Sequence, residues 1–208
     1  MENAVVPRLW RDDIASVLVS EKQLATRVRA LAFEIERDFS GRDLVLVALL
    51  SGTVVFLADL LRELRIPLRL DFMAISSYSN GTTPGPLVLS KDLRLNVKGR
   101  DVLVVDDIAD SGRTLDLVLT RIRKLKPRRL KTCVLLDKQT RRVKRVPLDY
   151  VGFRIPDAFV VGYGLDFAER FRNLPFVGVL HPSLYTSAGG TPDEPAPKLK
   201  QRRGRSAR

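Results

Sequence analysis

The sequence predicts an α/β fold in which a mostly parallel central sheet carries helices on both of its faces. The first observation is a set of continuous apolar runs, such as residues 44–50 and 102–105, which are typical of strands buried on both sides. The second is that helical segments alternate with these runs along the chain, as they do in parallel α/β sheets. The third is the length of 208 residues, which suits one domain with a sizeable core.

The elements follow one another in a regular order. We expect a first helix over residues 21–39, because Ser20 and Gln23 form a capping box, apolar residues recur at helical spacing, and Gly41 ends the segment. The later elements are predicted as a strand at 44–50, a helix at about 54–65, strands at 68–75 and 101–106, a helix at 115–124, a strand at 131–136, and short strands at 150–153 and 158–161.

Two segments have the composition of irregular structure. Residues 76–91 contain Tyr78 and several Gly, Pro and Asn residues, which predict turns and a mobile loop. Residues 187–208 are rich in Gly, Pro, Ala, Lys and Arg, and Leu199 is the only large apolar side chain there. We therefore expect a disordered basic tail after a folded domain of residues 1–186.

Bulk properties exclude several classes of protein. A single cysteine, Cys133, rules out an intrachain disulfide framework and favours the cytosol, and its apolar neighbours predict that it is buried. We expect neither a signal peptide nor a membrane span. The net charge of +12 is compatible with a solvated basic face, an anionic small molecule or RNA, and we do not expect a nucleic-acid partner.

The strongest functional signal lies between residues 102 and 115. Four apolar residues lead to Asp106 and Asp107, and a short loop then carries Ser111, Gly112 and Thr114 into a helix. Glycine permits close approach of the backbone, and hydroxyls with free N–H groups at a helix start bind phosphate. The carboxylates suit ribose hydroxyls or a divalent cation. The pattern predicts a sugar-phosphate site rather than a turn with an acidic N-cap.

This stretch resembles the phosphoribosyl-pyrophosphate motif of the type I phosphoribosyltransferases. Four further segments, residues 50–53, 76–78, 136–138 and 159–175, occur in the expected order and resemble the hypoxanthine-guanine phosphoribosyltransferases. The resemblance covers about residues 10–182. It implies a type I fold with a small hood subdomain, built from the N-terminal segment and about residues 155–182.

The same resemblance implies an enzyme of purine salvage in the cytoplasm. It would transfer ribose 5-phosphate from 5-phosphoribosyl 1-pyrophosphate to hypoxanthine and/or guanine, with Mg²⁺ as cofactor, giving IMP or GMP and pyrophosphate. Asp110 would be the catalytic general base that takes the proton of purine N7. The phosphate and ribose site would comprise Asp106, Asp107, Ile108, Ala109, Ser111, Gly112, Arg113 and Thr114, and the metal ligands would be Asp106, Asp107 and Asp166.

Other residues would hold the leaving group and the base. Ser51, Gly52 and Arg172 would bind pyrophosphate, and the lid would include Ser77 and Tyr78. The purine would contact Lys138, Phe159, Val160 and Asp166, with the ring of Phe159 stacked on the base. The ammonium of Lys138 can only donate hydrogen bonds, which favours a 6-oxo group over the amino group of adenine.

One position departs from the family pattern. Ser51 stands where relatives usually carry a basic residue, and we therefore expect weaker pyrophosphate binding. The sequence leaves open whether the Leu50–Ser51 peptide bond is cis. His181 is the lone histidine, and the sequence assigns it no role.

Two other functions remain open at this point. One is a nucleotide-binding regulator on the same fold that acts on RNA or protein. The basic charge favours it, whereas Lys138, Phe159, Asp166 and Asp110 together favour an enzyme. The other is a type I enzyme with a different base, since the sequence does not separate hypoxanthine, guanine and xanthine. The resemblance suggests a homodimer or homotetramer, and the role of the basic tail is left open.

Overall fold

The computed structural model describes residues 5–77 and 87–186, and it confirms the α/β sheet that the sequence predicts. A six-stranded sheet has the order β4-β3-β2-β5-β6-β7, with β4 antiparallel to its neighbour and the other pairs parallel. Tyr78 and the predicted tail lie outside the described residues. The strands are β2 (Leu44–Leu50), β3 (Leu68–Ser77), β4 (Leu87–Lys91), β5 (Asp101–Ala109), β6 (Arg129–Asp137) and β7 (Tyr150–Arg154).

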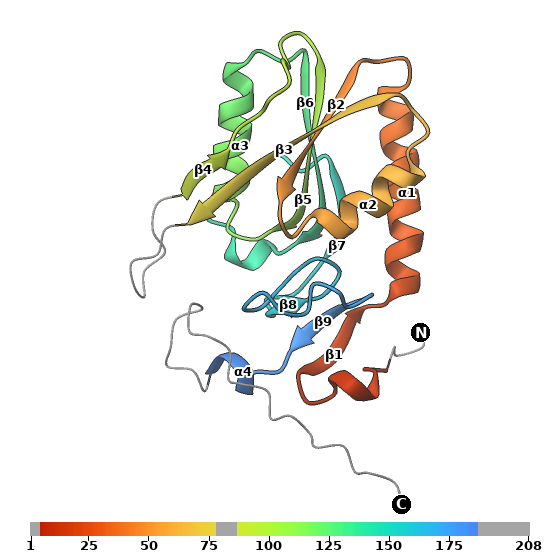
Figure 1. The fold of residues 1–208 in the computed structure, drawn as a ribbon, viewed down its shortest axis with the longest axis vertical. Helices are drawn as coiled ribbons and strands as arrows, with labels where there is room; N and C mark the ends of the chain where they lie inside the picture. Colours follow the sequence, from red (N-terminus) through yellow and green to blue (C-terminus); the bar gives the residue numbers. More distant parts are fainter. Residues whose placement is uncertain (1–4, 78–86, 187–208) are drawn as a thin grey trace, which may run out of the picture.

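Helices cover both faces of this sheet, as expected (Figure 1). Helices α1 (Glu21–Phe39) and α2 (Val54–Glu63) lie on one face, and α3 (Arg113–Lys124) lies on the other. Strand β2 shows why, because Leu44, Leu46 and Ala48 belong to the core beneath α1 and α2 while Val45 and Val47 belong to the core beneath α3. The predicted capping box at Ser20 is present at the start of α1.

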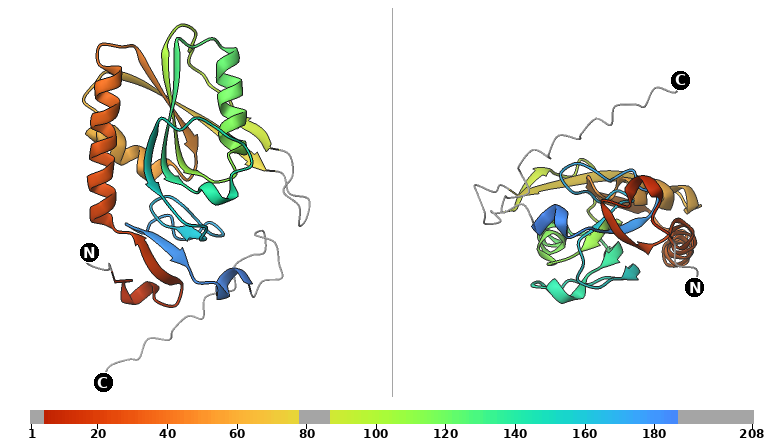
Figure 2. Two further views of the ribbon diagram at one scale, coloured as in Figure 1. Left: turned by 180° about the vertical axis from the view of Figure 1, so that it is seen from behind. Right: turned by 90° about the horizontal axis from the view of Figure 1, so that it is seen from below.

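A second, three-stranded antiparallel sheet lies beyond the carboxyl ends of the parallel strands (Figure 2). Its order is β1-β9-β8, formed by β1 (Ile14–Val19), β9 (Val177–Leu180) and β8 (Val160–Val161). The sequence predicted β8 but neither β1 nor β9. The remaining short elements are the 3-10 turns η1 (Arg8–Trp10) and η2 (Gln139–Arg141) and the helix α4 (Ser183–Thr186).

The largest difference from the sequence prediction concerns residues 76–91, which were assigned to one loop. Strand β3 continues through Ser77, and residues 87–91 form β4, so the irregular segment is shorter than predicted. Residues 87–91 form a strand because they pair with β3, Leu89 opposite Ile75 and Val88 opposite Ser76. Residues 78–86 lie outside the described part of the chain.

Within the described residues, no helix has both the length and the apolar character needed to span a bilayer. Cys133 is fully buried in β6, as predicted, and burial raises the pKa of its thiol. The thiol therefore behaves as a small apolar group of the core.

Asp38 stabilises the fold in a pH-dependent way. Its carboxylate accepts hydrogen bonds from Lys131 Nζ and Tyr150 Oη, both at 2.7 Å. The Lys131 hydrogen bond, followed by that of Tyr150, lowers the pKa of Asp38 from 3.8 to about 2. Since the folded-state pKa lies below the unfolded-state value, the stabilisation is complete above about pH 4 and is lost as the pH falls toward 2.

We therefore expect Asp38→Asn to lower the free energy of unfolding by ~1–2 kcal/mol at pH 6. The difference between wild type and variant should shrink steadily between about pH 4 and pH 2. Urea unfolding at several pH values measures it, with the exposed Asp12 changed to Asn as the control. A difference that stays constant down to pH 2 would contradict this account.

Candidate functional site

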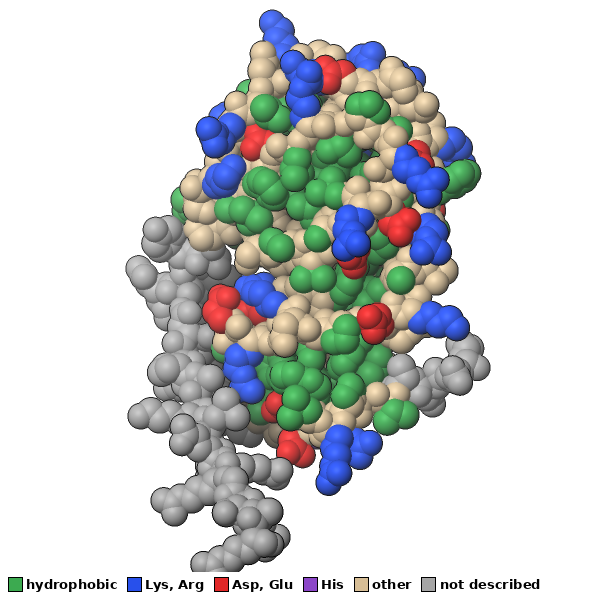
Figure 3. Space-filling model, turned by 45° about the vertical axis from the view of Figure 1, so that its right-hand side comes forward, with side chains coloured by type: hydrophobic (Ala, Val, Ile, Leu, Met, Phe, Trp, Pro, Cys, Tyr) green, Lys and Arg blue, Asp and Glu red, His purple; other side chains and the backbone are tan. Residues whose placement is uncertain are grey.

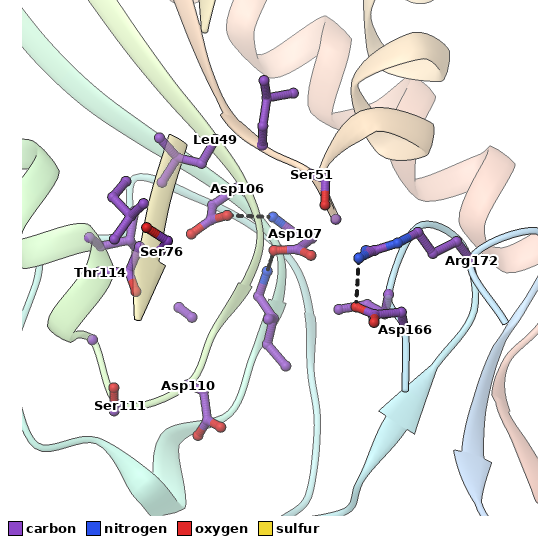
Figure 4. A pocket seen from close by; sticks show the side chains of 18 of the residues that line it. Leu49, Ser51, Ser76, Asp106, Asp107, Asp110, Ser111, Thr114, Asp166 and Arg172 are labelled. Atoms are coloured by element: carbon purple, nitrogen blue, oxygen red, sulfur yellow. Dashed lines mark hydrogen bonds and ion pairs between the residues drawn. The ribbon is translucent and has the colours of Figure 1, made fainter. Parts of the chain in front are cut away.

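A cavity of about 620 Å³ opens at the carboxyl ends of β2, β3 and β5. This is the edge at which ligands bind in open α/β sheets. In Figure 4, Asp106 and Asp107 lie at its centre, with Ser111 and Thr114 on one side and Ser51, Asp166 and Arg172 on the other. The lining comes from residues 49–52, 75–76, 106–112, 114–115 and 165–166, together with Glu169 and Arg172.

Asp106 and Asp107 form the floor of the cavity at the end of β5. Asp106 Oδ1 accepts a hydrogen bond from Asp107 N at 3.0 Å and one from Thr53 Oγ1 at 3.4 Å, and Asp107 Oδ1 accepts one from Ile108 N at 2.8 Å. Burial, reinforced by the charge of Asp107, raises the pKa of Asp106 well above its ordinary value. Burial also raises the pKa of Asp107, against the opposing effect of its hydrogen bonds and of Arg172.

Gly52 packs directly against one of these carboxylates. A Cβ atom added at Gly52 would lie 1.8 Å from Asp107 Oδ2, so any larger residue there would displace this carboxylate. The peptide bond between Leu50 and Ser51, which the sequence left open, is cis. Ser51 is exposed and lines the cavity beside Gly52.

The loop that follows β5 is held in place by hydrogen bonds that its carbonyl groups accept. Arg142 Nε donates to the carbonyl of Asp110 at 3.0 Å, and another nitrogen of the same guanidinium donates to the carbonyl of Ala109 at 2.9 Å. The amides of Val143 and Lys144 both donate to the carbonyl of Ser111 at 2.9 Å. Arg142 is itself fixed by an ion pair of 2.5 Å with Asp137.

Because these hydrogen bonds involve the carbonyl groups of the loop, its amide groups remain available to a ligand. Among the residues that the structure describes, none accepts a hydrogen bond from the backbone N–H of Ser111, Gly112 or Thr114. Gly112 has a φ of +79°, and a Cβ there would lie 2.3 Å from the carbonyl oxygen of Lys144. The start of α3 therefore has the free donors and the dipole orientation that bind an anion.

Asp110 is the first residue of this loop, and its side chain lies next to a buried lysine. Its Oδ2 is 3.7 Å from Lys138 Nζ, and Asp157 Oδ1 lies 3.8 Å from the same nitrogen. Asp110 Oδ1 is buried and has no hydrogen-bond partner among the described residues. A buried, unpaired carboxylate oxygen is costly, and such groups are characteristic of functional sites.

Arg172 is already paired within the chain. It donates to the carbonyl of Gly164 at 2.9 Å and forms ion pairs with Asp166 at 2.9 Å and Glu169 at 3.1 Å. Glu169 N also donates to Asp166 Oδ2 at 3.0 Å. Arg172 therefore reaches the cavity with most of its charge balanced by two carboxylates.

The structure does not bring every predicted residue to the wall of the cavity. Lys138, Phe159 and Val160 do not line it, although Lys138 adjoins Asp110. Val160 is buried in β8, and Phe159 is 39% exposed beside it. Arg113 is exposed at the start of α3, outside the lining. Ser77 is the last residue of β3.

The acidic groups of the cavity fit a magnesium ion that also binds the substrate. Within the described ranges, no cluster of three or more His, Cys, Asp or Glu side chains forms a complete metal cage. Mg²⁺ is usually held by one or two carboxylates together with water and substrate phosphates. The adjacent carboxylates of Asp106 and Asp107 are a donor set of that kind.

Four polar residues at or beside the site were not predicted from the sequence: Glu169, Arg142, Asp137 and Asp157. Glu169 lies three positions before Arg172, a spacing that could have suggested an ion pair. Arg142 stood in a run of basic residues with nothing to distinguish it from its neighbours. Its hydrogen bonds to the carbonyl groups of Ala109 and Asp110 span more than 30 positions along the chain, so no local signal identifies this role.

Comparison with known proteins places this architecture in a family. The phosphoribosyl transferase domain matches residues 16–168. The chain is 42% identical over 180 residues to hypoxanthine-guanine phosphoribosyltransferase of Bacillus subtilis, covering 86% of this chain and 100% of that protein. It is 46% identical to the bifunctional protein TilS/HprT of Listeria monocytogenes over 176 residues, which are 84% of this chain but span only 27% of that protein's length.

Solved structures agree. A hypoxanthine phosphoribosyltransferase from Staphylococcus aureus superposes with a TM-score of 0.81 at 37% identity, covering 87% of this chain and 99% of that one. Sequence and three-dimensional structure thus identify relatives of the same kind over most of the chain. The chain belongs to the phosphoribosyl transferase family.

Proposed function

We propose that this protein is a hypoxanthine(-guanine) phosphoribosyltransferase of purine salvage, acting in the cytoplasm. It transfers ribose 5-phosphate from 5-phosphoribosyl 1-pyrophosphate to hypoxanthine and/or guanine. The observation that carries the proposal is the unpaired, buried Oδ1 of Asp110, placed between a loop with free amide donors and the buried ammonium of Lys138. In this proposal an anion site, a proton acceptor and a donor to the 6-oxo group lie along one edge of the sheet.

In this proposal the cavity binds the donor from end to end. The amides and hydroxyls of Ser111 and Thr114 hold the 5-phosphate, and Asp106 and Asp107 accept hydrogen bonds from the ribose hydroxyls. The pyrophosphate lies toward Ser51, Gly52 and Arg172, on the opposite side of the carboxylates (Figure 4). The two ends of the cavity thus fit the two phosphorylated ends of the donor.

The base enters beside Asp110. Lys138 donates to the 6-oxo oxygen, Phe159 stacks on the ring, and the backbone of Val160 fixes its edge. Purine N9 forms a bond to C1 of the ribose as the bond from C1 to the pyrophosphate oxygen breaks, and Asp110 takes the proton from N7. Pyrophosphate leaves with the electron pair of the broken bond.

Magnesium belongs to the same proposal, with Asp106, Asp107 and Asp166 as its protein ligands. When bound, Mg²⁺ supplies positive charge that offsets the charge of the departing pyrophosphate. Asp166 is paired with Arg172 in the structure, so it would have to exchange that partner to reach the metal.

A turnover assay tests the function directly. The protein is incubated with 5-phosphoribosyl 1-pyrophosphate, Mg²⁺ and, in turn, hypoxanthine, guanine, xanthine and adenine. We expect IMP or GMP with hypoxanthine or guanine, and little product with adenine because Lys138 cannot accept a hydrogen bond from its amino group. A protein that forms no nucleotide from any of these bases would contradict the proposal.

Ser51 offers a second test. A lysine at this exposed position would add a cation at the end of the cavity assigned to pyrophosphate. We expect Ser51→Lys to lower the Kd of the donor by about three- to tenfold, since one partly exposed charge contributes ~1 kcal/mol. Isothermal titration calorimetry measures this affinity. Ser51→Gln is the matched control, with a long side chain but no charge, and equal affinities of the two variants would refute the charge effect.

The alternative of an RNA-binding regulator is weakened because many of the basic residues are paired with carboxylates of the same chain. Arg121, Arg128, Lys131, Arg141 and Arg142 each form an ion pair with a carboxylate of this chain. On the face shown in Figure 3, Lys and Arg side chains are spread among acidic and apolar ones rather than gathered in one patch. Nucleic-acid binding usually needs a continuous basic surface.

Three further features complete the proposal. The sheet β1-β9-β8 forms the hood over the cavity, and the lid that the resemblance implies, with Ser77 and Tyr78, falls largely outside the described residues. The protein is a homodimer or homotetramer, on the strength of the family resemblance. Size-exclusion chromatography with light scattering measures the oligomeric state, and a monomer at assay concentration would refute that part.

A further inference from the structure

The Phe159 ring has a partner to which the proposed function gives no role. Tyr185 stacks on it, with ring centroids 5.3 Å apart and planes inclined by 25°. Phe167 makes an edge contact with the same ring, at 5.4 Å and 89°. Phe159 is 39% exposed, so without these neighbours its ring would be largely unconstrained. Two aromatic rings thus hold the side chain that is proposed to bind the base.

The short segment between β9 and Tyr185 is held by hydrogen bonds that place Tyr185 over Phe159. Leu180 N donates to the carbonyl of Phe159 at 2.8 Å, which joins the end of β9 to the residue before β8. The chain then turns at His181, whose amide donates to the carbonyl of Asp13 at 2.8 Å. His181 Nδ1 lies 2.7 Å from Ser183 Oγ and accepts a hydrogen bond from Ser183 N at 3.3 Å.

These contacts give His181 a structural role that the sequence did not reveal. They fix the first residues of α4, and α4 carries Tyr185 back over the Phe159 ring. Leu184 and Tyr185 also pack against the apolar cluster beneath the three-stranded sheet. The stack is therefore part of an ordered connection and not a chance contact of an exposed side chain.

We propose that Tyr185 is a positioning residue for the base, which holds the Phe159 ring in the orientation that the purine needs. The inference rests on the proposed function, in which Phe159 stacks on the purine. A ring that is already fixed loses less rotamer freedom when the base binds, so binding is tighter. Stacked aromatic pairs contribute enough beyond their buried area for this to be measurable. The donor sugar, bound elsewhere in the cavity, does not depend on it.

Steady-state kinetics with hypoxanthine tests the inference. We expect Tyr185→Ala to raise the KM for hypoxanthine by about three- to tenfold and to leave the KM for 5-phosphoribosyl 1-pyrophosphate within about twofold. Tyr185→Phe, which keeps the ring, should behave as wild type. Tyr185→Leu keeps apolar contact with the core but has no ring, and it should raise the KM for hypoxanthine by a similar factor. It therefore tests the inference even if the alanine variant folds poorly.

Several outcomes would overturn the role of Tyr185. An equal rise in both KM values would indicate a general loss of structure, and an unchanged KM for the base would show that the stack is irrelevant. A fall in the KM for the base would mean that Tyr185 blocks the site. Turnover by the wild type separates this inference from the function itself, because a wild type without activity refutes the enzyme, whereas an active wild type with unaffected variants refutes only the positioning role.

Discussion

Replacement of Asp110 by asparagine is expected to lower kcat by about 10²–10⁴-fold, the range that a well-placed general base contributes. Asn keeps the size of the side chain and an oxygen that can accept a hydrogen bond, but it cannot take the proton of purine N7. The neighbourhood supports this reading, since Asp110 Oδ1 is buried without a partner among the described residues and Lys138 Nζ lies 3.7 Å from Oδ2. The two oxygens thus have different surroundings, since Oδ2 lies beside the ammonium of Lys138 and Oδ1 has no hydrogen-bond partner among the described residues.

The same substitution should leave the Kd of the donor within about threefold of the wild-type value, because the proposed function gives Asp110 no contact with the phosphate groups. Single-turnover and steady-state kinetics separate the two effects. Asp116→Asn, in the first turn of the same helix α3, is the matched control and should retain wild-type kcat. A kcat reduced less than about fivefold in Asp110→Asn would show that another group accepts the proton.

The end of the cavity that we assign to the phosphate could be located from the sequence because its residues are contiguous along the chain. Strand, carboxylates, loop and helix start all fall within residues 101–124, and β5 and α3 are each identified by local patterns of apolar residues. The carboxyl end of a central parallel strand fixes where such a loop must lie. Sequence order and spatial order therefore coincide there.

The rest of the site depends on contacts between segments far apart in the chain. Strands β1 and β9 escaped prediction because each is short and is defined by pairing across about 160 residues, as in Ile14 opposite Leu180. Arg142 and Tyr185 act through partners that only the folded chain brings near them. The spacing of apolar residues indicates which face of a helix or strand is buried, but it does not indicate which loops lie next to one another in the fold.

Gly52→Ala should produce the largest effect at the other end of the cavity, a fall in kcat/KM of about 100-fold or more. The added Cβ would lie 1.8 Å from Asp107 Oδ2 and 2.9 Å from Asp107 Cγ, closer than any side chain tolerates. The carboxylate must therefore move away from the position in which we propose that it binds the ribose. Displacements of about 1 Å at a reacting centre are enough to cost two orders of magnitude in rate.

The control for this substitution is Gly99→Ala, in the loop before β5. Gly99 has a φ of +71° and nothing within 4 Å of an added Cβ, so the change strains the backbone without touching the site. It should lower stability by ~1 kcal/mol and leave kcat/KM unchanged. Gly52→Ala should show the opposite pattern, with little change in the unfolding midpoint and a large loss of activity. Comparable activity of the two variants would mean that Asp107 tolerates displacement, and that its fixed position beside Gly52 is not what holds the ribose.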